Sequence, residues 1–464
     1  MGSSMADKRT GSTRRSFLTG TLAGTAILSG CAARVGSTSS YLTAFAPRSA
    51  DPVFEWTDIA LQAIRDQIVA PPLAARALAM GHVAGFCAVN GVEERYSTYR
   101  GLSPAESRVD ARSAYGTAFR VAIAEHFQQP FALEHARFLS TIPDSDAKSR
   151  GVEWGARIGR AIVKMRTGDG THPSRSDHYL GRYTRRDDVL RWRPTGPHFD
   201  AGEGPAYGSY QRGLLPGFGQ VRPWGVSSLA SFRAPAFPHP RSAEFARQYD
   251  MVRRLGRSDS VERTRDQREI ALFWEDGPWG VTPPGHFAVV AMQLMARNRM
   301  TFTQRARGMA LVSMAMADAA TTTWDSKYAH DVLRPETAIR YRAAKLDPRL
   351  AGDSNWKSLI PTPPFPAYTS GHSAFGAAGT RMLAHVLGTD RIRLAAKSPD
   401  RVIWPKALAD AERSWTSLSQ MAEENGMSRI YGGVHWLADH VEGMRAGRDV
   451  ADAIHGLNFR AASA

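Results

Sequence analysis

Apolar residues recur every three to four positions through most of the chain, which is the spacing that gives an α-helix one apolar face. Strand-like alternation of apolar and polar residues is rare. The predicted helices cover residues 56–68, 111–127, 155–165, 287–299, 303–326, 373–387, 406–427 and 435–455. The chain is therefore predicted to be all-α, with two helical halves that can pack as bundles.

Residues 168–240 interrupt this pattern with closely spaced Gly, Pro, Tyr and Trp. A loop of this length in a compact protein is either disordered or functional, and its aromatic content favours an ordered segment that wraps the helices. We call residues 168–240 the wrapping segment. The expected organisation is a signal and linker over residues 1–40, a helical bundle with the wrapping segment over 41–240, and a second helical bundle over 241–464.

The first residues have the features of an export signal. Residues 13–18 (TRRSFL) precede a weakly apolar stretch up to Leu28, an order that resembles a twin-arginine signal. Residues 28–31 (LSGC) also resemble a lipobox, in which Cys31 is acylated after cleavage, and an ordinary signal-peptidase site nearby is the alternative. We therefore expect an extracytoplasmic protein, either free or lipid-anchored through Cys31. No apolar run reaches the roughly 18–20 residues of a membrane-spanning helix, so no membrane span is expected.

The charge balance favours an anionic partner. The chain has 59 Lys and Arg against 44 Asp and Glu, a formal net charge of +15. No Lys/Arg run is interleaved with aromatic residues, so nucleic acid is not an expected partner. Its two cysteines, Cys31 and Cys87, exclude a disulfide framework, and no paired Cys/His spacing indicates a zinc site.

A first candidate motif lies in residues 327–335 (KYAHDVLRP), where Lys327 and Arg334 are seven positions apart. Seven positions are two helical turns, so both heads point to one side if the helix continues to Pro335. Lys supplies a point charge and Arg a planar fork, a combination that suits a tetrahedral oxyanion. Taken alone, this spacing equally fits a solvated basic face.

A second motif is the proline-rich approach over residues 361–368 followed by Thr369, Ser370, Gly371 and His372, directly before a predicted helix. A helix N-terminus with a serine hydroxyl and a glycine amide binds anions through unpaired N–H groups and the helix dipole. His372 is then placed for proton transfer. The alternative is an ordinary N-cap beside a surface histidine.

A third motif spans residues 428–439 (SRIYGGVHWLAD), where two glycines separate Arg429 from His435. Asp439 follows His435 by four positions, so its carboxylate can hold one imidazole nitrogen and leave the other free for a metal or for phosphorus. A surface His/Asp pair is the alternative, and the segment alone does not decide between them.

The three motifs occur in one order, Lys-x6-Arg-Pro, then Ser-Gly-His, then Ser-Arg-x5-His-x3-Asp. This order resembles the superfamily of type 2 phosphatidic acid phosphatases, bacterial acid phosphatases and vanadium-dependent haloperoxidases. Thr369 stands where the family usually has Pro, a difference that can alter the rigidity of the loop but removes no ligand. The members share a site because vanadate mimics phosphate in geometry and charge.

Two aromatic residues favour the haloperoxidase branch. Trp324, three residues before Lys327, and Phe365, seven before His372, fall where chloroperoxidases of this superfamily place aromatic residues near the halide. Bromide- and iodide-selective members commonly have His at the second position. The resemblance to bacterial haloperoxidases covers roughly residues 190–460.

The resemblance implies a role for each motif residue. His435 ligates vanadium with Asp439 as its orienting partner, His372 is the acid/base in peroxide activation, and Lys327 contacts the bound peroxide. The groups that hold the vanadate oxygens are Lys327, Arg334, Ser370, the Gly371 amide and Arg429. The implied fold is two four-helix bundles, commonly in a homodimer. The implied partners are hydrogen peroxide, chloride or bromide, and a small organic substrate such as a prenylated aromatic meroterpenoid, which is halogenated and cyclised.

Two other functions use the same residues. In an acid phosphatase, phosphate occupies the site, His435 attacks phosphorus and His372 protonates the leaving oxygen. In a non-halogenating relative, the pocket rearranges a natural-product intermediate with or without vanadate. The aromatic pair and the wrapping segment disfavour the phosphatase, whereas no motif separates the third function from the first.

Overall fold

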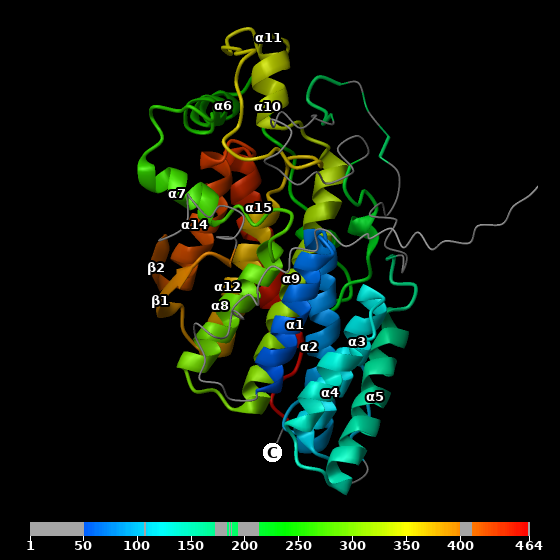
Figure 1. Cartoon of the computed structure of the whole chain (residues 1–464). Coiled ribbons are helices and arrows are strands. Elements are labelled where there is room, and N and C mark those ends of the chain that lie inside the picture. The colour runs from blue at the N-terminus through cyan, green and yellow to red at the C-terminus, as the bar shows by residue number, and fades with distance from the viewer. Residues whose placement is uncertain are drawn as a thin grey trace, which may run out of the picture. The chain divides into compact units, whose positions relative to one another are not determined.

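A computed structural model describes residues 51–105, 108–171, 183–184, 186, 188–193, 213–399 and 411–462, which belong to one compact unit beginning at Ser40. The predicted export signal and Cys31 lie outside the described residues. The helices are α1 (Pro52–Asp66), α2 (Pro71–Glu93), α3 (Ala111–Phe127), α4 (Ala132–Ser140), α5 (Asp146–Arg166), α6 (Ala243–Leu255), α7 (Arg265–Phe273), α8 (Thr282–Arg297), α9 (Phe302–His330), α10 (Pro335–Thr337), α11 (Ala343–Leu346), α12 (Gly371–Leu387), α14 (Leu418–Tyr431) and α15 (Leu437–Leu457) (Figure 1).

The remaining regular structure is short. Two 3-10 turns, η1 (Phe218–Gln220) and η2 (Ala230–Phe232), interrupt the wrapping segment, and a π-helical stretch, η3 (Ala338–Arg342), joins α10 to α11. Strands β1 (Arg391–Lys397) and β2 (Glu412–Ser417) pair antiparallel. The all-α prediction is therefore confirmed, with one small two-stranded sheet added.

The predicted helix over residues 406–427 is wrong in its first part. Residues 412–417 form β2, and α14 begins only at Leu418. Trp415 pairs with Leu394 across the sheet, and its ring packs against Phe273 and Trp274. The segment forms a strand despite its helical periodicity, because a strand buries this large ring on the inner face of the sheet.

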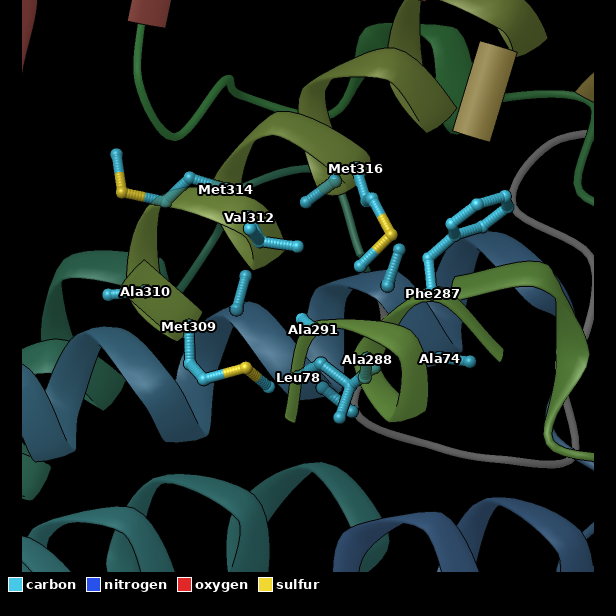
Figure 2. Packing of buried hydrophobic residues seen from close by; sticks show 14 of the residues in the cluster. Ala74, Leu78, Phe287, Ala288, Ala291, Met309, Ala310, Val312, Met314 and Met316 are labelled. Carbon is cyan, nitrogen blue, oxygen red and sulfur yellow. The ribbon is translucent and has the colours of Figure 1, made fainter. Parts of the chain in front are cut away.

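Helix α9 is the central element of the core. It packs against α2, α8, α12 and α15, and Figure 2 shows its side chains facing those of α2 and α8. Leu78 of α2, Phe287 of α8 and Met316 of α9 are all fully buried in one cluster. This cluster joins residues from both halves of the chain, and the predicted division at residues 240 and 241 stays a prediction.

Helix α2 has the length and hydropathy of a membrane-spanning helix, which the sequence reading did not anticipate. Its most apolar window is 94% buried inside the protein. The surrounding helices α3, α5 and α9 cover it. This degree of burial is that of a core helix, whose surface is covered by protein on all sides.

The described parts of the wrapping segment lie against the elements that carry the motifs. Tyr183 Oη donates to Asp331 Oδ1 at 3.1 Å, and the Trp192 amide donates to the Asp331 carbonyl at 2.8 Å. Further along, the amides of Trp224 and Gly225 donate to the two carboxylate oxygens of Asp318, at 2.7 and 2.8 Å. The segment thus contacts α9 at Asp318, within the helix, and at Asp331, its C-cap.

Candidate active site

All three motifs meet at one pocket: the second and third line it, and Lys327 and Arg334 of the first contact its lining residues Phe365 and His435. The C-terminal turn of α9 carries Lys327, and the extended stretch after it carries Arg334. The N-terminus of α12 supplies the Ser-Gly-His motif, the last turn of α14 supplies Arg429, and the loop before α15 supplies His435. Segments more than 100 residues apart in the sequence therefore form one site.

Lys327 and Arg334 do meet, but not on one helix. Helix α9 ends at His330, and Asp331 adopts the left-handed conformation with φ of 54°. Arg334 follows on extended backbone, with φ of −77° and ψ of 155°. Both cationic heads still lie over the ring of Phe365, each 4.9 Å from its centroid. Helix α9 does not continue to Pro335, because a helix cap at Asp331 redirects the chain while keeping both charges on one side.

The N-terminus of α12 is built for an anion. Ser370 is the N-cap, and its hydroxyl accepts the amide of Ser373 at 3.3 Å. Within the described part of the chain, no hydrogen bond takes the amides of Gly371 and His372. A Cβ added at Gly371 would come no closer than 3.7 Å to Trp324, so the space beside this amide is open. Two amides and the helix dipole are thus directed toward the pocket.

His435 and Asp439 form the predicted pair. His435 Nδ1 lies 2.7 Å from Asp439 Oδ2, which also accepts the Trp436 amide at 2.9 Å. The carboxylate therefore keeps the proton on Nδ1, and Nε2, 3.0 Å from Arg334 Nη1, keeps a lone pair. Burial first, and then the charge of Arg334, hold the pKa of His435 well below its usual range. The imidazole is consequently neutral and able to act as a ligand or nucleophile.

Lys327 is fully buried, and its Nζ donates to three backbone carbonyls. These are Pro366 at 2.9 Å, Ala367 at 3.0 Å and Thr369 at 2.5 Å. Burial and the neighbouring Arg334 lower the pKa of Lys327 well below its usual value. Lys327 therefore fixes the loop that leads into α12, and contacting a bound oxyanion requires it to exchange one of these carbonyls.

Arg334 has an unused donor. Its Nε donates to the Phe365 carbonyl at 2.8 Å and its Nη1 to the Val434 carbonyl at 2.7 Å, whereas the buried Nη2 has no hydrogen-bond partner among the described residues. Burial lowers the pKa of Arg334 to about 9. A buried, unpaired guanidinium nitrogen is costly, and an oxyanion would satisfy it.

His372 and Arg429 are held by the same backbone carbonyl. His372 Nε2 lies 3.2 Å from the Glu275 carbonyl oxygen, which also accepts Arg429 Nη1 at 3.2 Å. Nε2 of His372 therefore carries the proton, and Nδ1 is its acceptor atom. Burial, followed by the charge of Arg429, keeps the pKa of His372 well below 6.5. A neutral imidazole of this kind can take a proton from an incoming acid.

The pocket is mostly apolar with a few polar groups. Trp324 and Phe365 form an aromatic wall with ring centroids 5.1 Å apart. Four further predicted residues, Gly371, His372, Arg429 and His435, also line the pocket, while Lys327, Arg334, Ser370 and Asp439 lie fully buried outside its lining. The other lining residues are Pro71, Glu275, Asp276, Gly277, Pro278, Pro283, Pro361, Pro363 and Phe375.

Sequence reasoning missed the loop between α7 and α8. Asp276 is buried and its Oδ1 lies 2.8 Å from His286 Nδ1, and the His286 ring stacks on Trp274 with centroids 4.4 Å apart. This pair fixes the loop whose Glu275 carbonyl holds both His372 and Arg429. Ten positions separate Asp276 from His286 across a proline-rich turn, so no helical or strand spacing indicates the pair.

The donor set fits a tetrahedral oxyanion such as vanadate or phosphate. Lys327 and Arg334 lie close enough to Arg429 that the three charges disfavour one another, and Asp439 is the carboxylate that opposes the first two. A bound anion would offset this repulsion. Among the described residues no group of three or more His, Cys, Asp or Glu side chains could hold a bare metal ion. The cationic side chains, the amides of α12 and the single imidazole of His435 suit a metal that arrives as an oxyanion and takes one histidine.

Comparisons with known proteins agree with this geometry. Residues 307–462 match the family model described as the second helical-bundle domain of VCPO. The vanadium chloroperoxidase of Curvularia inaequalis is 25% identical over 39% of this chain, and the match spans only 37% of that relative's length.

Solved structures share the fold over more of the chain. The first bacterial vanadium-dependent iodoperoxidase is 24% identical, with a TM-score of 0.73 over 90% of this chain and 99% of the other. An apo-type bacterial vanadium-dependent chloroperoxidase is 16% identical, with a TM-score of 0.63 over 83% of this chain and 92% of the other. The family model over residues 307–462, the sequence match and the shared fold thus make the chain similar to vanadium-dependent haloperoxidases.

Proposed function

We propose that this protein is a vanadium-dependent haloperoxidase that uses hydrogen peroxide to oxidise chloride or bromide and so halogenates an organic substrate. The observation that carries the proposal is the orientation of His435. Its Nδ1 is held by Asp439 and its unprotonated Nε2 lies 3.0 Å from Arg334 Nη1, and Gly371 and His372 of α12 line the same pocket. This is the arrangement that a single-histidine vanadate site requires.

Bound vanadate would supply the Lewis-acid centre at which hydrogen peroxide is activated toward halide. The chain contributes fixed positive charge from Arg334, Arg429 and Lys327, which withdraws electron density from the anion's oxygens. Ser370 and the Gly371 amide orient those oxygens. His372 accepts the proton of the incoming peroxide at Nδ1, because its Nε2 is committed to the Glu275 carbonyl.

The aromatic wall supports chloride as the halide. Trp324 and Phe365 offer an apolar surface next to the cations, and Trp324 is held by a hydrogen bond from its Nε1 to the Leu214 carbonyl at 3.0 Å. A weakly polar wall strips water from the halide, while the cations behind it compensate the charge. Chloride, the more strongly hydrated ion, needs this compensation more than bromide.

The lining of the pocket supports an apolar organic substrate. Pro71, Pro361 and Pro363 continue the apolar surface beyond the aromatic wall. Apolar rings with few polar groups suit a flat aromatic body bearing a prenyl chain. We therefore propose a prenylated aromatic meroterpenoid as substrate, with cyclisation following halogenation. We further propose export by the twin-arginine route, with or without acylation of Cys31, and a homodimeric assembly.

The test is a parallel assay of the purified protein and two variants. Vanadate, hydrogen peroxide and chloride or bromide are supplied with monochlorodimedone or a prenylated phenol, a parallel sample with the prenylated phenol omits halide, and p-nitrophenyl phosphate is supplied separately. Halogenation is expected for the wild type and is expected to disappear in His435→Ala. His455→Ala changes a histidine on α15 away from the pocket and should retain halogenation.

Two results would overturn the proposal in different directions. Release of p-nitrophenol without halogenation would show that phosphate is the natural occupant and that His435 acts as a nucleophile. Rearrangement of a prenylated phenol without halide would place the chain among non-halogenating relatives. A phosphatase would also lose its activity in His435→Ala. The product that the wild type forms therefore distinguishes the two functions, and the loss of activity in the variant does not.

A further inference from the structure

Three side chains outside the motifs tie the site together behind the pocket. His440 Nδ1 lies 3.0 Å from Ser373 Oγ, and His440 Nε2 lies 3.0 Å from Glu423 Oε1. Ser373 is on α12, Glu423 on α14 and His440 on α15. These three helices carry, or directly follow, the residues of the second and third motifs. A single hydrogen-bonded chain therefore joins the elements that must hold one oxyanion.

The order Ser, His, Glu is that of a hydrolase triad, but the geometry excludes nucleophilic catalysis. Ser373 is 0% exposed and His440 is 3% exposed, and Ser373 lies inside the first turn of α12. Neither residue lines the pocket. A nucleophile needs an open approach for its substrate, which Ser373 lacks. The role left for the three side chains is to position other groups.

Ser373 is connected directly to the anion-binding turn. Its amide donates to the hydroxyl of Ser370, and its own hydroxyl is held by His440. Because Ser370 accepts this amide, its O–H proton is free to donate to an oxyanion. The amides of Gly371 and His372 lie in the same turn. Holding Ser373 therefore fixes the direction of each of these donors.

The orientation of the His440 ring follows from its partners. The Glu423 carboxylate can only accept, so His440 Nε2 donates to it and Nδ1 is the ring atom that faces the Ser373 hydroxyl. The hydrogen bond from His440 is the main reason that the pKa of Glu423 is lowered. The side chain of Glu423 is 58% exposed, so the contact orients the ring but contributes little energy by itself.

Two glycines make this close approach possible. A Cβ at Gly426 of α14 would lie 2.1 Å from His440 Nδ1, and a Cβ at Gly443 of α15 would lie 2.7 Å from the Ser370 carbonyl oxygen. Helix α15 therefore rests directly on the first turn of α12. The backbone leaves just enough room for the imidazole to reach Ser373.

We propose that His440 is a positioning residue for the oxyanion. Oriented by Glu423, it holds Ser373 and thereby aligns the Ser370 hydroxyl and the Gly371 and His372 amides with the bound vanadate. This inference rests on the proposed function, since it assumes that the pocket binds vanadate. In this role His440 affects the affinity for the oxyanion through α12 and contacts no reacting atom itself.

The test measures orthovanadate binding to the full-length protein by isothermal titration, with circular dichroism as the check on folding. His440→Phe keeps the ring volume and removes both hydrogen bonds, and Ser373→Ala removes the same link from the other side. Each is expected to weaken vanadate binding by about tenfold, the lower end for lost outer partners of a metal site. The double variant is expected to lose no more than either single variant, because both break one link. His455→Phe, on the same helix, serves as the matched control.

Two further variants separate positioning from simple packing. The amide of His440→Asn lies near the former Nδ1 and can still bond Ser373, whereas His440→Gln reaches toward Glu423. Affinity is expected to recover in His440→Asn and to stay low in His440→Gln. Glu423→Gln, which keeps an acceptor on an exposed side chain, is expected to change affinity by less than threefold.

The outcomes distinguish this inference from the proposed function. Failure of the wild type to bind vanadate would overturn the proposed function, and the inference with it. Binding by the wild type with unchanged affinity in His440→Phe and Ser373→Ala would overturn the inference alone. Losses that add in the double variant, or equal losses in His440→Asn and His440→Gln, would also overturn it, because they indicate general damage to packing.

Discussion

His435 Nδ1 lies 2.7 Å from Asp439 Oδ2, although helix α15 begins only at Leu437 and His435 stands outside it. The Trp436 amide donates to the same carboxylate oxygen at 2.9 Å. The first turn of α15 thus presents a carboxylate that caps the helix and orients the proposed vanadium ligand. One carboxylate oxygen serves both purposes.

Replacing Asp439 with Asn should weaken both contacts. If the NH₂ group of the amide turns toward His435, it favours the wrong tautomer and leaves the Trp436 amide without its acceptor. Vanadate affinity is expected to fall by about 10- to 100-fold, the range for outer partners of a metal ligand. Glu442→Gln, on the next turn of α15, is the control. Titration of both variants with vanadate checks the prediction, and equal affinities would contradict it.

Replacing Phe365 with His should shift the halide preference. The ring of Phe365 lies 4.9 Å from both Lys327 Nζ and the Arg334 guanidinium carbon, in a nearly dry wall. A polar imidazole brings water to this surface, which penalises chloride more than bromide. The chloride-to-bromide ratio of kcat/KM is expected to fall about tenfold, equivalent to about 1.4 kcal/mol. Phe365→Leu keeps the wall apolar, so an equal fall in that variant would show that polarity is not the cause.

Replacing Gly433 with Ala should loosen the third motif. Gly433 has φ of +79°, and an added Cβ would lie 2.3 Å from the Gly256 carbonyl oxygen. The left-handed conformation alone costs a non-glycine residue about 1–2 kcal/mol, and the backbone contact adds to it. The variant is expected to unfold at lower denaturant concentration and to bind vanadate more weakly, since Arg429 and His435 flank this turn. Gly456→Ala, where no atom lies within 4 Å, should be neutral or stabilising.

Stability should fall in mild acid because of His82. This residue is 0% exposed between Thr57 and Tyr115, and burial lowers its pKa from 6.5 to about 3. The stability that the neutral His82 ring contributes to the folded protein is fully present above pH 6.5. Between pH 6.5 and 3 the unfolded chain binds a proton that the folded chain refuses, so stability declines as pH falls, by up to about 1.4 kcal/mol per pH unit.

Urea unfolding of the wild type and His82→Gln at several pH values between 7.5 and 4.5 checks this decline. The neutral amide cannot bind the proton, so its unfolding free energy should fall less steeply than that of the wild type. Parallel curves for the two proteins would mean that His82 does not control the acid response.

Several elements could be predicted because their causes lie within a few residues. The helix Ala111–Phe127 has its predicted bounds, since an Asp110 cap and a continuous apolar face mark both ends locally. The Ser370 cap and the His435/Asp439 pair were visible for the same reason. The end of α9 could not be read in the same way, because its cap residue Asp331 is held by Tyr183 and Arg186 of the wrapping segment. Such partners have no fixed spacing.

The sequence by itself determined which side chains could serve the candidate site: the donors, the imidazole and the carboxylate that orients it. Those properties belong to side chains and to turns a few residues long, so they can be read in order along the chain. Only the tertiary structure decided that Lys327 donates its hydrogen bonds to carbonyls of the loop before α12. It also decided that Asp276 and His286 fix the loop whose Glu275 carbonyl holds His372 and Arg429, and that His440 joins Ser373 to Glu423. These contacts join segments 10 to 67 residues apart, and only the packing of helices in three dimensions brings such segments within hydrogen-bond distance.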